Sequence, residues 1–543
     1  MTNGPSPAAE PVLAGVPAFW PAGAPLRLGQ LPPGTARLAT RNAFGDTVAA
    51  ASPDAGFAGL DPATWTVQAW SADGRLLADE LVTVAEHPGA SPVMGFATTF
   101  AGDTGPVTEW LRALRCTVVQ AYDWMASYSR PLPRESADDG ASWHDPLGRP
   151  VELAALRALA AGLASGGTVL QAYAPVYAAD PGFAAAHPEL LLYRSDGQPE
   201  CLGDLLEITN PADDRWRRHW ISEHQAALAA VGFCGLHIDT YGYPRAAADQ
   251  AGRPVPIGPA YRSFLAQAAA AFPAAVVSFN QVNGVPSGLP LSSARRFRYI
   301  EAWPPNQAWR HLEGLLARGT GTAGQGEATV LAIYPPVWSA GSRADALRTV
   351  LLTEAIVTVL GAGLLAWGDD HGVLRHPYYP DHERLTGAEA QTALRWHRFA
   401  LRHRDLFGPA ADTSWQDIGD ENGSVAVHGT AAPSPEPLGG TLFTRVTRRD
   451  DLVAVSLIDL TGSAAGRWDE PSGRGSAGQA TVDVLVDQPD GWTAEIATLG
   501  SSGGRFHPVS TTPTAHREGT ALRFGVPLGD GWAIARLRRT AMS

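Results

Sequence analysis

Two acidic residues occupy positions in this sequence that are typical of catalytic side chains. The segment Gly232-Phe-Cys-Gly-Leu-His-Ile-Asp239-Thr-Tyr-Gly242 is an apolar run that ends on a carboxylate and breaks into a loop with glycine. Further along, Phe297-Arg-Tyr-Ile-Glu301-Ala-Trp303 ends in the same way. In a parallel α/β protein the carboxyl ends of the strands share one face, where the chemistry is done. Two carboxylates on that face suit hydrolysis of a glycosidic bond, which needs one proton donor and one nucleophile or base.

Each of these acids also has an ordinary structural explanation. An aspartate after a strand can cap a helix or a loop, but the apolar run before Asp239 and the loop Thr240-Tyr241-Gly242 after it favour a functional role. A glutamate buried at a strand end, as expected for Glu301, costs free energy unless it is paired or used. We therefore predict that Asp239 and Glu301 are the catalytic residues.

Polar side chains also end other predicted strands, in Tyr122-Asp123-Trp124, Asn280-Gln281-Val282-Asn283 and Trp367-Gly-Asp369-Asp370-His371. Amides and carboxylates suit sugar hydroxyls, which both donate and accept hydrogen bonds. Asp123 could instead cap its loop. His237 points to the same side of its strand as Asp239. It could bind a sugar hydroxyl or be a buried core histidine, and the same two interpretations apply to His371. The acids near Asp369 lack the oxygen-rich spacing of a calcium loop, so we predict no metal and no other cofactor.

Aromatic residues gather at the same strand ends. They are Tyr173, Tyr177, Tyr241, Trp303, Trp309, Tyr334 and Trp338. Any one of them alone is more often a packing residue, but as a set they are typical of stacking platforms for pyranose rings. The predicted substrate-binding residues are Tyr122, Asp123, Trp124, Tyr173, Tyr177, His237, Tyr241, Asn280, Gln281, Asn283, Trp303, Tyr334, Asp369 and His371.

The elements that must position these residues alternate between short apolar strands and amphipathic helices. Eight strands are predicted, at 93–99, 116–122, 168–174, 234–239, 275–280, 297–301, 329–334 and 363–367. Helical patterns lie between them, for example over 151–164, 213–230, 261–271 and 344–360. Eight such repeats predict an α/β fold, a (β/α)₈ TIM barrel. A doubly wound sheet is the alternative, but it does not need eight similar repeats.

Strand patterns without helices flank this central region. Residues 64–70 and 76–84 alternate like strands around a turn at 72–74, and five further strand patterns follow residue 425. We predict an N-terminal Ig-like β-sandwich with a loose tail over 1–91, a catalytic barrel over 92–425 and a Greek-key β-sandwich over 426–543.

Composition excludes several functions. The net charge of −13 argues against nucleic acid and against an anionic membrane surface, since both need a basic face. Lysine is absent, which excludes Schiff-base chemistry and a phosphate-binding P-loop. The three cysteines show no spacing for a zinc site or a disulfide framework. Neither a signal peptide nor a long apolar segment is visible, so we expect a cytoplasmic protein, or a secreted one if a leader was removed.

The chain resembles glycoside hydrolase family 66, the dextranases and cycloisomaltooligosaccharide glucanotransferases. The resemblance covers residues 92–400 and, more weakly, both flanking regions. Its motifs, in chain order, are Val118-Val-Gln-Ala-Tyr-Asp-Trp124-Met, Arg130-Pro-Leu-Pro133, Gln171-Ala-Tyr-Ala-Pro-Val-Tyr177-Ala-Ala, His187-Pro-Glu-Leu, Gly232-Phe-Cys-Gly-Leu-His-Ile-Asp239-Thr, Phe279-Asn-Gln-Val-Asn-Gly284, Tyr299-Ile-Glu301-Ala-Trp303 and Tyr378-Tyr-Pro-Asp-His-Glu-Arg-Leu385. Several motifs in the right order are far more specific than any one alone.

The resemblance implies a retaining mechanism on α-1,6-linked glucans such as dextran or isomaltooligosaccharides. Asp239 matches the family's nucleophile and Glu301 its acid/base, so Asp239 should be ionised while Glu301 holds a proton. Ile238 stands where family members usually carry glycine, and short or cyclic isomaltooligosaccharides therefore suit the sequence as well as the polymer does.

Three activities remain open on this basis: a hydrolase, a transglycosylase that uses the same residues, and an inactive glucan-binding protein. The interval between Trp303 and the helix expected over 344–360 leaves no room for the inserted carbohydrate-binding module of cyclising members, which favours hydrolysis. The presence of both Asp239 and Glu301 argues against an inactive protein. The sequence predicts no oligomeric state.

Overall fold

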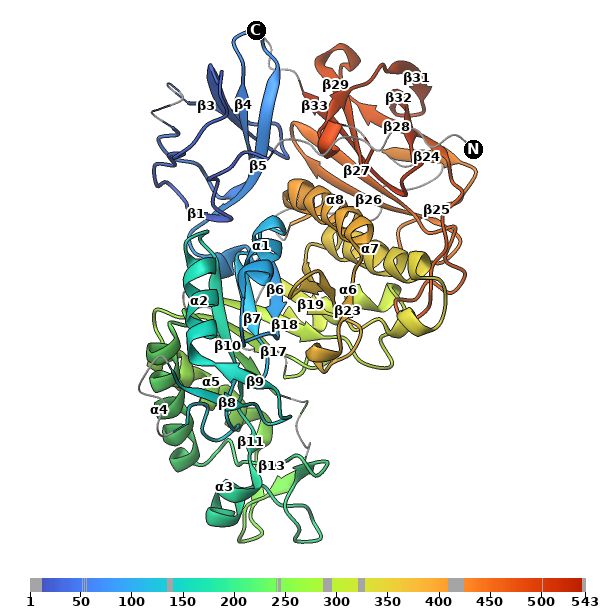
Figure 1. Ribbon diagram of the computed structural model, residues 1–543. Coiled ribbons are helices and arrows are strands. Elements are labelled where there is room, and N and C mark those ends of the chain that lie inside the picture. The colour runs from blue at the N-terminus through green and yellow to red at the C-terminus, as the bar shows by residue number, and fades with distance from the viewer. Residues whose placement is uncertain are drawn as a thin grey trace.

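The computed structural model describes residues 12–50, 52, 54, 56–133, 140–240, 242, 246–286, 295–320, 328–408, 424–500 and 502–539. Its centre is a curled sheet of eleven strands (Figure 1). Eight parallel strands run through it: β6 (Met94–Ala97), β7 (Val118–Ala121), β10 (Val169–Pro175), β14 (Gly235–Asp239), β17 (Val276–Asn280), β18 (Arg296–Glu301), β19 (Thr329–Ala332) and β20 (Gly363–Leu365). Each of the eight predicted strand segments therefore overlaps an observed strand.

The two ends of this parallel sheet approach each other. β21 (Trp367–Gly368) follows β20 after Ala366 alone, and Gly368 pairs in parallel with Phe96 of β6. The segment 363–368 therefore pairs with β19 at one end and with β6 at the other. Two short strands, β22 (Gly372–Val373) and β23 (Glu383–Arg384), extend the sheet in antiparallel fashion beyond β21.

Helices connect most of the parallel strands. They are α1 (Gly105–Ala113), α2 (Leu153–Ala164), α3 (Pro181–Ala186), α4 (Asp214–Val231), α5 (Ile257–Ala271), α6 (Arg310–Thr320), α7 (Arg343–Val359) and α8 (Gly387–His403). Between β17 and β18 the structure describes residues 281–286 and 295, which are not helical, so a helix in this one repeat stays a prediction.

Local capping fixes both ends of α4, the helix that precedes β14. The Asp213 side chain accepts from the Arg215 amide at the start of α4, and Gly232 ends that helix with a φ of 88°. A left-handed residue at this position favours glycine, and it turns the chain directly into β14. The cap thus sets where the strand that carries Asp239 begins.

The N-terminal region is simpler than the predicted sandwich. It forms one five-stranded sheet in the order β1-β5-β4-β2-β3, built from β1 (Phe19–Pro21), β2 (Arg37–Asn42), β3 (Thr47–Ala49), β4 (Ala63–Trp70) and β5 (Leu76–Ala85). An isolated bridge between Leu26 and Phe57 packs into the same apolar cluster as Trp65 and Val67. In the described residues a single sheet therefore covers this core, and the second layer is only that bridge.

The C-terminal region has two sheets, as a β-sandwich requires. One has the order β24-β28-β32-β31 and the other β25-β26-β27-β33-β29-β30. Their strands are β24 (Val425–Gly429), β25 (Pro433–Ser434), β26 (Leu442–Arg449), β27 (Leu452–Asp459), β28 (Gln479–Val486), β29 (Trp492–Thr498), β30 (His507–Pro508), β31 (Thr512–His516), β32 (Gly519–Pro527) and β33 (Trp532–Arg539). Apolar side chains of both sheets form one buried core.

The central sheet is covered on one side by α7 and α8, which lie between it and the C-terminal sheets (Figure 1). On the opposite side, a small β-structure with β11 (Ala178–Ala179), β12 (Cys201–Leu202) and β13 (Leu206–Ile208) projects near α3. Two short hairpins complete the fold, β8 (Ser142–His144) with β9 (Pro150–Glu152) and β15 (Ala247–Ala248) with β16 (Pro254–Val255). Within the ranges described, no helix has the length and apolarity needed to cross a membrane.

Candidate active site

Asp239 is the last residue of β14 and is held from both neighbouring strands. The Tyr173 hydroxyl of β10 donates to its Oδ2 at 2.6 Å. The Asn280 amide, at the end of β17, donates to its Oδ1 at 2.7 Å. The carboxyl group is therefore buried with one donor on each oxygen, which fixes its orientation.

Glu301 is the last residue of β18 and is only half-buried. The Tyr334 hydroxyl, just after β19, donates to Oε1 at 2.6 Å, and the Trp303 indole N–H donates to Oε2 at 3.0 Å. Since β17 is the only strand between β14 and β18, both carboxyl groups reach the same edge of the sheet. Two oriented carboxyl groups on one edge can share a proton and attack or protonate a bound glycoside.

The electrostatics of this pair centre on Asp239. Burial is the largest cause that raises its pKa, to about 8, and the neighbouring Glu301 charge adds to the rise. The hydrogen bonds from Tyr173 and Asn280 act in the opposite direction because they favour the ionised form. Asp239 and Glu301 thus titrate as a coupled pair, in which burial favours a proton on Asp239 and its two hydrogen-bond donors favour the carboxylate.

His237 is a buried core histidine rather than an exposed sugar ligand. Its Nδ1 lies 2.8 Å from the Ser278 hydroxyl, and that hydroxyl donates to Gln171 Oε1 at 3.0 Å. Since Ser278 gives its only proton to Gln171, Nδ1 of His237 carries the hydrogen. Burial lowers the pKa of His237 to about 3, so the ring is neutral. Of the two alternatives that the sequence leaves open, this geometry matches the core residue.

Aromatic rings surround the two carboxyl groups. Tyr122 stacks on Tyr379 with ring centroids 4.2 Å apart and lies 4.8 Å from the ring of Tyr173. Trp303 and Tyr334 pack edge to face at 6.1 Å beside Glu301. Tyr177 is also buried, and burial raises its pKa well above the usual range. These rings provide the apolar walls that a sugar ring needs.

Asp123 lies in a strained and buried position after β7. Its φ is 48°, its side chain is buried, and its backbone oxygen accepts from Arg149 Nη2 at 3.3 Å. Burial raises its pKa to about 7, although the Arg149 charge opposes the rise. A buried carboxyl group on strained backbone next to the site fits a functional residue better than a simple loop cap.

Three predicted substrate-binding residues instead support the loops around the site. Trp124, predicted to bind substrate, is fully buried and donates to the Tyr173 backbone oxygen at 3.2 Å, a geometry that matches a packing residue. Gln281 is buried and donates to the Pro286 oxygen at 2.6 Å. Asn283 Oδ1 accepts from the Trp303 amide at 2.8 Å, which fixes the turn after Glu301.

The remaining predicted residues have no printed contact with Asp239 or Glu301, or lie outside the described residues. Asp369 is buried with φ of 42° and accepts from the hydroxyls of Thr98 and Thr99. His371 packs against Trp110 of α1 with ring centroids 4.6 Å apart. Tyr241 lies outside the described residues. Of the other two aromatics, Trp309 is a buried core residue that donates to Thr353, and Trp338 stacks against the Arg343 guanidinium.

Sequence reasoning missed two tyrosines of the site, Tyr299 and Tyr379. Tyr299 precedes Glu301 by two residues and therefore points to the same side of β18, a signal that the alternation of a strand provides. Tyr379 comes from the segment after β22, in the short helix η5 (Tyr379–Asp381), and only the fold brings it to the site.

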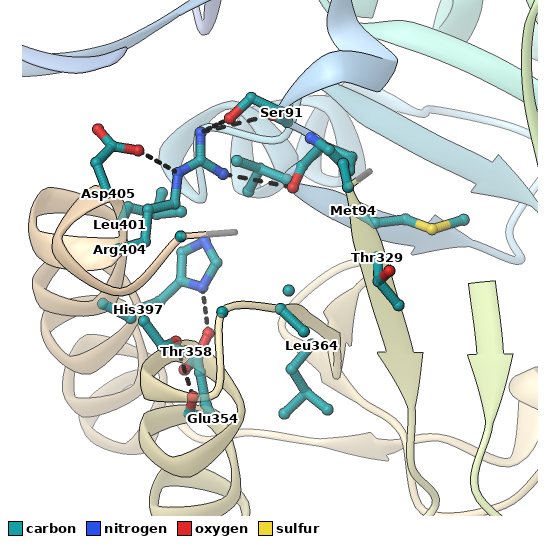
Figure 2. A pocket seen from close by; sticks show the side chains of 18 of the residues that line it. Ser91, Met94, Thr329, Glu354, Thr358, Leu364, His397, Leu401, Arg404 and Asp405 are labelled. Carbon is teal, nitrogen blue, oxygen red and sulfur yellow. Dashed lines mark hydrogen bonds and ion pairs between the residues drawn. The ribbon is translucent and has the colours of Figure 1, made fainter. Parts of the chain in front are cut away.

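A cavity of about 150 Å³ lies elsewhere, at the amino ends of the parallel strands (Figure 2). Met94, Thr329 and Leu364 line it, together with Glu354 of α7 and His397 of α8. It is thus at the opposite end of the strands from Asp239 and Glu301 and does not belong to the carboxylate site. In the part of the chain that is described, no three His, Cys, Asp or Glu side chains group as metal ligands.

The chain is similar to known proteins over most of its length. Residues 46–534 match the family described as Glycosyl hydrolase family 66. A cycloisomaltooligosaccharide glucanotransferase of Niallia circulans is 22% identical over 271 residues, which is 46% of this chain and 28% of that protein. A second sequence of the same name and organism is 22% identical over 40% of this chain and 24% of its own length. The chain thus spans about a quarter of the curated relatives it matches.

Solved structures share the fold at low sequence identity. The cycloisomaltooligosaccharide glucanotransferase of Paenibacillus sp., complexed with cycloisomaltoheptaose, superposes with a TM-score of 0.78 and 16% identity. The match covers 97% of this chain and 100% of that chain. The α-amylase of Geobacillus thermoleovorans, complexed with acarbose, has a TM-score of 0.51 and 8% identity over 83% of this chain and 99% of its own.

Proposed function

Because this chain belongs to glycosyl hydrolase family 66, we propose that it cleaves α-1,6-glucosidic bonds with retention, through a covalent glucosyl-enzyme on Asp239. The observation that carries this proposal is the pair of carboxyl groups at the ends of β14 and β18, each with two hydrogen-bond donors. Retaining glycosidases need two such groups, one as nucleophile and one as acid and base.

In this mechanism Asp239 attacks the anomeric carbon while Glu301 protonates the departing glycosidic oxygen. Glu301 then takes a proton from the incoming hydroxyl, which releases the sugar. The two donors on Asp239 favour its ionised form, and the developing positive charge at the anomeric carbon favours it further. The proton that burial places on Asp239 must therefore reside on Glu301 when the bond breaks.

The proposed substrate is a dextran or isomaltooligosaccharide chain. This choice is supported by the family and by the relatives, whose names describe action on isomaltooligosaccharides. Sugar rings would lie against Tyr122, Tyr173 and Trp303, and the Asp123 carboxyl group would accept from a sugar hydroxyl. No metal or other cofactor enters this mechanism.

A second candidate activity is transglycosylation, in which a sugar hydroxyl rather than water meets the glucosyl-enzyme. The specific observation in its favour is that both curated relatives are glucanotransferases. Asp239 and Glu301 would keep the same roles, since only the acceptor differs.

We also infer that the curled parallel sheet is a closed (β/α)₈ barrel. Support comes from the segment 363–368, which pairs with β19 at one end and β6 at the other. The division of the chain into an N-terminal β-domain over 1–91, a barrel over 92–425 and a C-terminal β-domain over 426–543 belongs to the same proposal. Asp239 and Glu301 then lie at the carboxyl ends of barrel strands, where such enzymes place their sites.

The test is product analysis with isomaltoheptaose and dextran. Wild type, Asp239→Asn, Glu301→Gln and a surface control, Asp196→Asn, are incubated with each sugar, and the products are separated by chromatography. Linear, shorter isomaltooligosaccharides from wild type and the control, lost in both site variants, would support the hydrolase. Cyclic or elongated products would instead support the transferase.

Two further measurements examine the mechanism itself. Proton NMR of the first products identifies their anomeric form, and an initial β anomer would contradict retention. A fluorinated glucosyl inhibitor should label the peptide that contains Asp239, as read by mass spectrometry. Labelling of another acid would overturn the assignment of the nucleophile, and wild type that leaves both sugars intact would overturn the α-1,6 assignment.

A further inference from the structure

Three buried tyrosines form a chain of hydroxyl groups that ends on Glu301. The Tyr334 hydroxyl lies 2.6 Å from Glu301 Oε1 and 3.4 Å from the Tyr379 hydroxyl. The Tyr379 hydroxyl lies in turn 2.5 Å from that of Tyr299. The three residues come from β18, from the end of β19 and from η5, so the fold rather than the local sequence assembles the chain.

The direction of these hydrogen bonds follows from the single hydroxyl proton that each tyrosine can donate. Glu301 Oε1 accepts from the Tyr334 hydroxyl, so Tyr334 gives its single proton to Glu301. The Tyr334 oxygen then accepts from Tyr379, and the Tyr379 oxygen accepts from Tyr299. Burial raises the pKa of all three phenols above the usual range, so each keeps its proton at neutral pH. Donors aligned in this way polarise one another and strengthen the last bond, which is the one to Glu301.

The Tyr379 ring is held independently of its hydroxyl. It stacks on Tyr122 with centroids 4.2 Å apart and an interplanar angle of 15°, and it meets Phe96 edge to face at 5.5 Å. Replacement by phenylalanine should therefore keep the ring in place and remove only the link between Tyr299 and Tyr334.

We propose that Tyr379 is a positioning residue that completes this chain through Tyr334 and thereby stabilises the Glu301 carboxylate that forms when the leaving group is protonated. The inference rests on the proposed function, in which Glu301 gives its proton to the glycosidic oxygen as the carbon–oxygen bond breaks and the bond to Asp239 forms. Glu301 becomes a carboxylate in that step, and the chain stabilises that carboxylate. The stabilisation appears in the transition state, where it accelerates the reaction.

The dependence on the leaving group tests this role. Cleavage of isomaltoheptaose releases a sugar alcohol and needs the proton, whereas α-isomaltosyl fluoride releases fluoride ion and does not. We expect Tyr379→Phe to lower kcat on isomaltoheptaose by about 3- to 10-fold, the size of one hydrogen bond. On the fluoride kcat should change by less than about 2-fold, and KM should stay the same on both.

The matched control is Tyr378→Phe, which removes a hydroxyl from the adjacent residue, whose ring faces the Arg149 guanidinium. It should leave the ratio of the two rates unchanged. Tyr334→Phe, which removes the direct donor to Glu301, should reproduce the selective loss and exceed it.

Equal losses on both substrates, or no loss on either, would overturn the positioning role while leaving the proposed function intact. A selective loss in Tyr378→Phe of the same size would overturn it as well. If wild type cleaves neither substrate, the proposed function fails, and the inference fails with it.

Discussion

The Tyr173 hydroxyl lies 2.6 Å from Asp239 Oδ2, and the two residues come from the adjacent parallel strands β10 and β14. The register pairs Tyr173 with His237, two residues before Asp239, so the phenol reaches forward along the sheet to the carboxyl group. Both groups are buried. A hydrogen bond to a buried carboxylate is among the stronger ones in proteins, which makes Tyr173 a support for the ionised form of Asp239.

Loss of this donor should slow catalysis. We expect Tyr173→Phe to lower kcat/KM on isomaltoheptaose about 10- to 100-fold, since a nucleophile without its donor is less often ionised. The control is Tyr193→Phe, which removes a hydroxyl that donates to the Pro188 oxygen at 2.8 Å. Rates are measured at one pH and corrected for the folded fraction. Equal rates in Tyr173→Phe and wild type would contradict this role.

The activity should fall as the pH rises through about 8. The pKa of Asp239 is raised to about 8 by burial and by the Glu301 charge, so the group holds a proton below that pH and loses it above. The carboxyl pair then has one proton at neutral pH and none in alkali, and protonation of the leaving group needs one. A profile of kcat/KM from pH 5 to 9.5 measures this, and a rate that stays constant up to pH 9.5 would contradict it.

The raised pKa of Asp239 also predicts how stability changes with pH. The folded chain holds a proton on Asp239 up to about pH 8, whereas the unfolded chain releases it near 3.8, the ordinary pKa of an aspartate. Between these values the folded state binds more protons, so the free energy of unfolding decreases as the pH rises.

Asp239→Asn should remove this loss of stability. We expect the variant to be more stable than wild type at pH 8 by about 1–3 kcal/mol, with a smaller difference at pH 5. Thermal unfolding at the two pH values measures the difference, and the exposed substitution Asp196→Asn serves as the control. A gain that is the same at both pH values would refute the linkage.

The sequence was sufficient to predict the strands that carry Asp239 and Glu301. The apolar runs before Asp239 and Glu301 form buried strands, and their carboxylates lie at the strand ends. A strand end does not tell whether a side chain faces a sugar or the core, so the sequence alone cannot show that Trp124 and His237 are buried. Tyr379 could not be found because its partner Tyr299 is 80 residues away and the contact depends on the path of the segment after β22.

The N-terminal region shows a similar limit. Alternating residues predict that Thr64–Trp70 is a strand, and β4 confirms it. Alternation alone does not tell what covers the buried face. In the structure the Leu26–Phe57 bridge covers the face of Trp65 and Val67, and on the opposite face Arg402 and Arg404 of the central region bond to Thr66 and Thr64.

The Glu354–His397 pair at the amino ends of the strands should contribute to stability rather than to catalysis (Figure 2). Glu354 Oε1 lies 2.6 Å from His397 Nδ1 and accepts from the Trp367 indole at 3.2 Å. His397 Nε2 donates to the Leu114 oxygen at 2.8 Å, so the pair links α7, α8, β21 and the end of α1. Both side chains are buried, and removing one partner leaves the other without compensation.

We expect Glu354→Ala to lower the free energy of unfolding by about 2–4 kcal/mol. The control is Arg253→Ala, which breaks an ion pair of 2.7 Å with Asp249 whose arginine is 80% exposed; it should cost less than about 0.5 kcal/mol because solvent screens the pair. Scanning calorimetry measures both, and the rate per folded molecule on isomaltoheptaose should equal that of wild type for each. A Glu354→Ala protein as stable as the control would show that this buried pair does not hold the helices together.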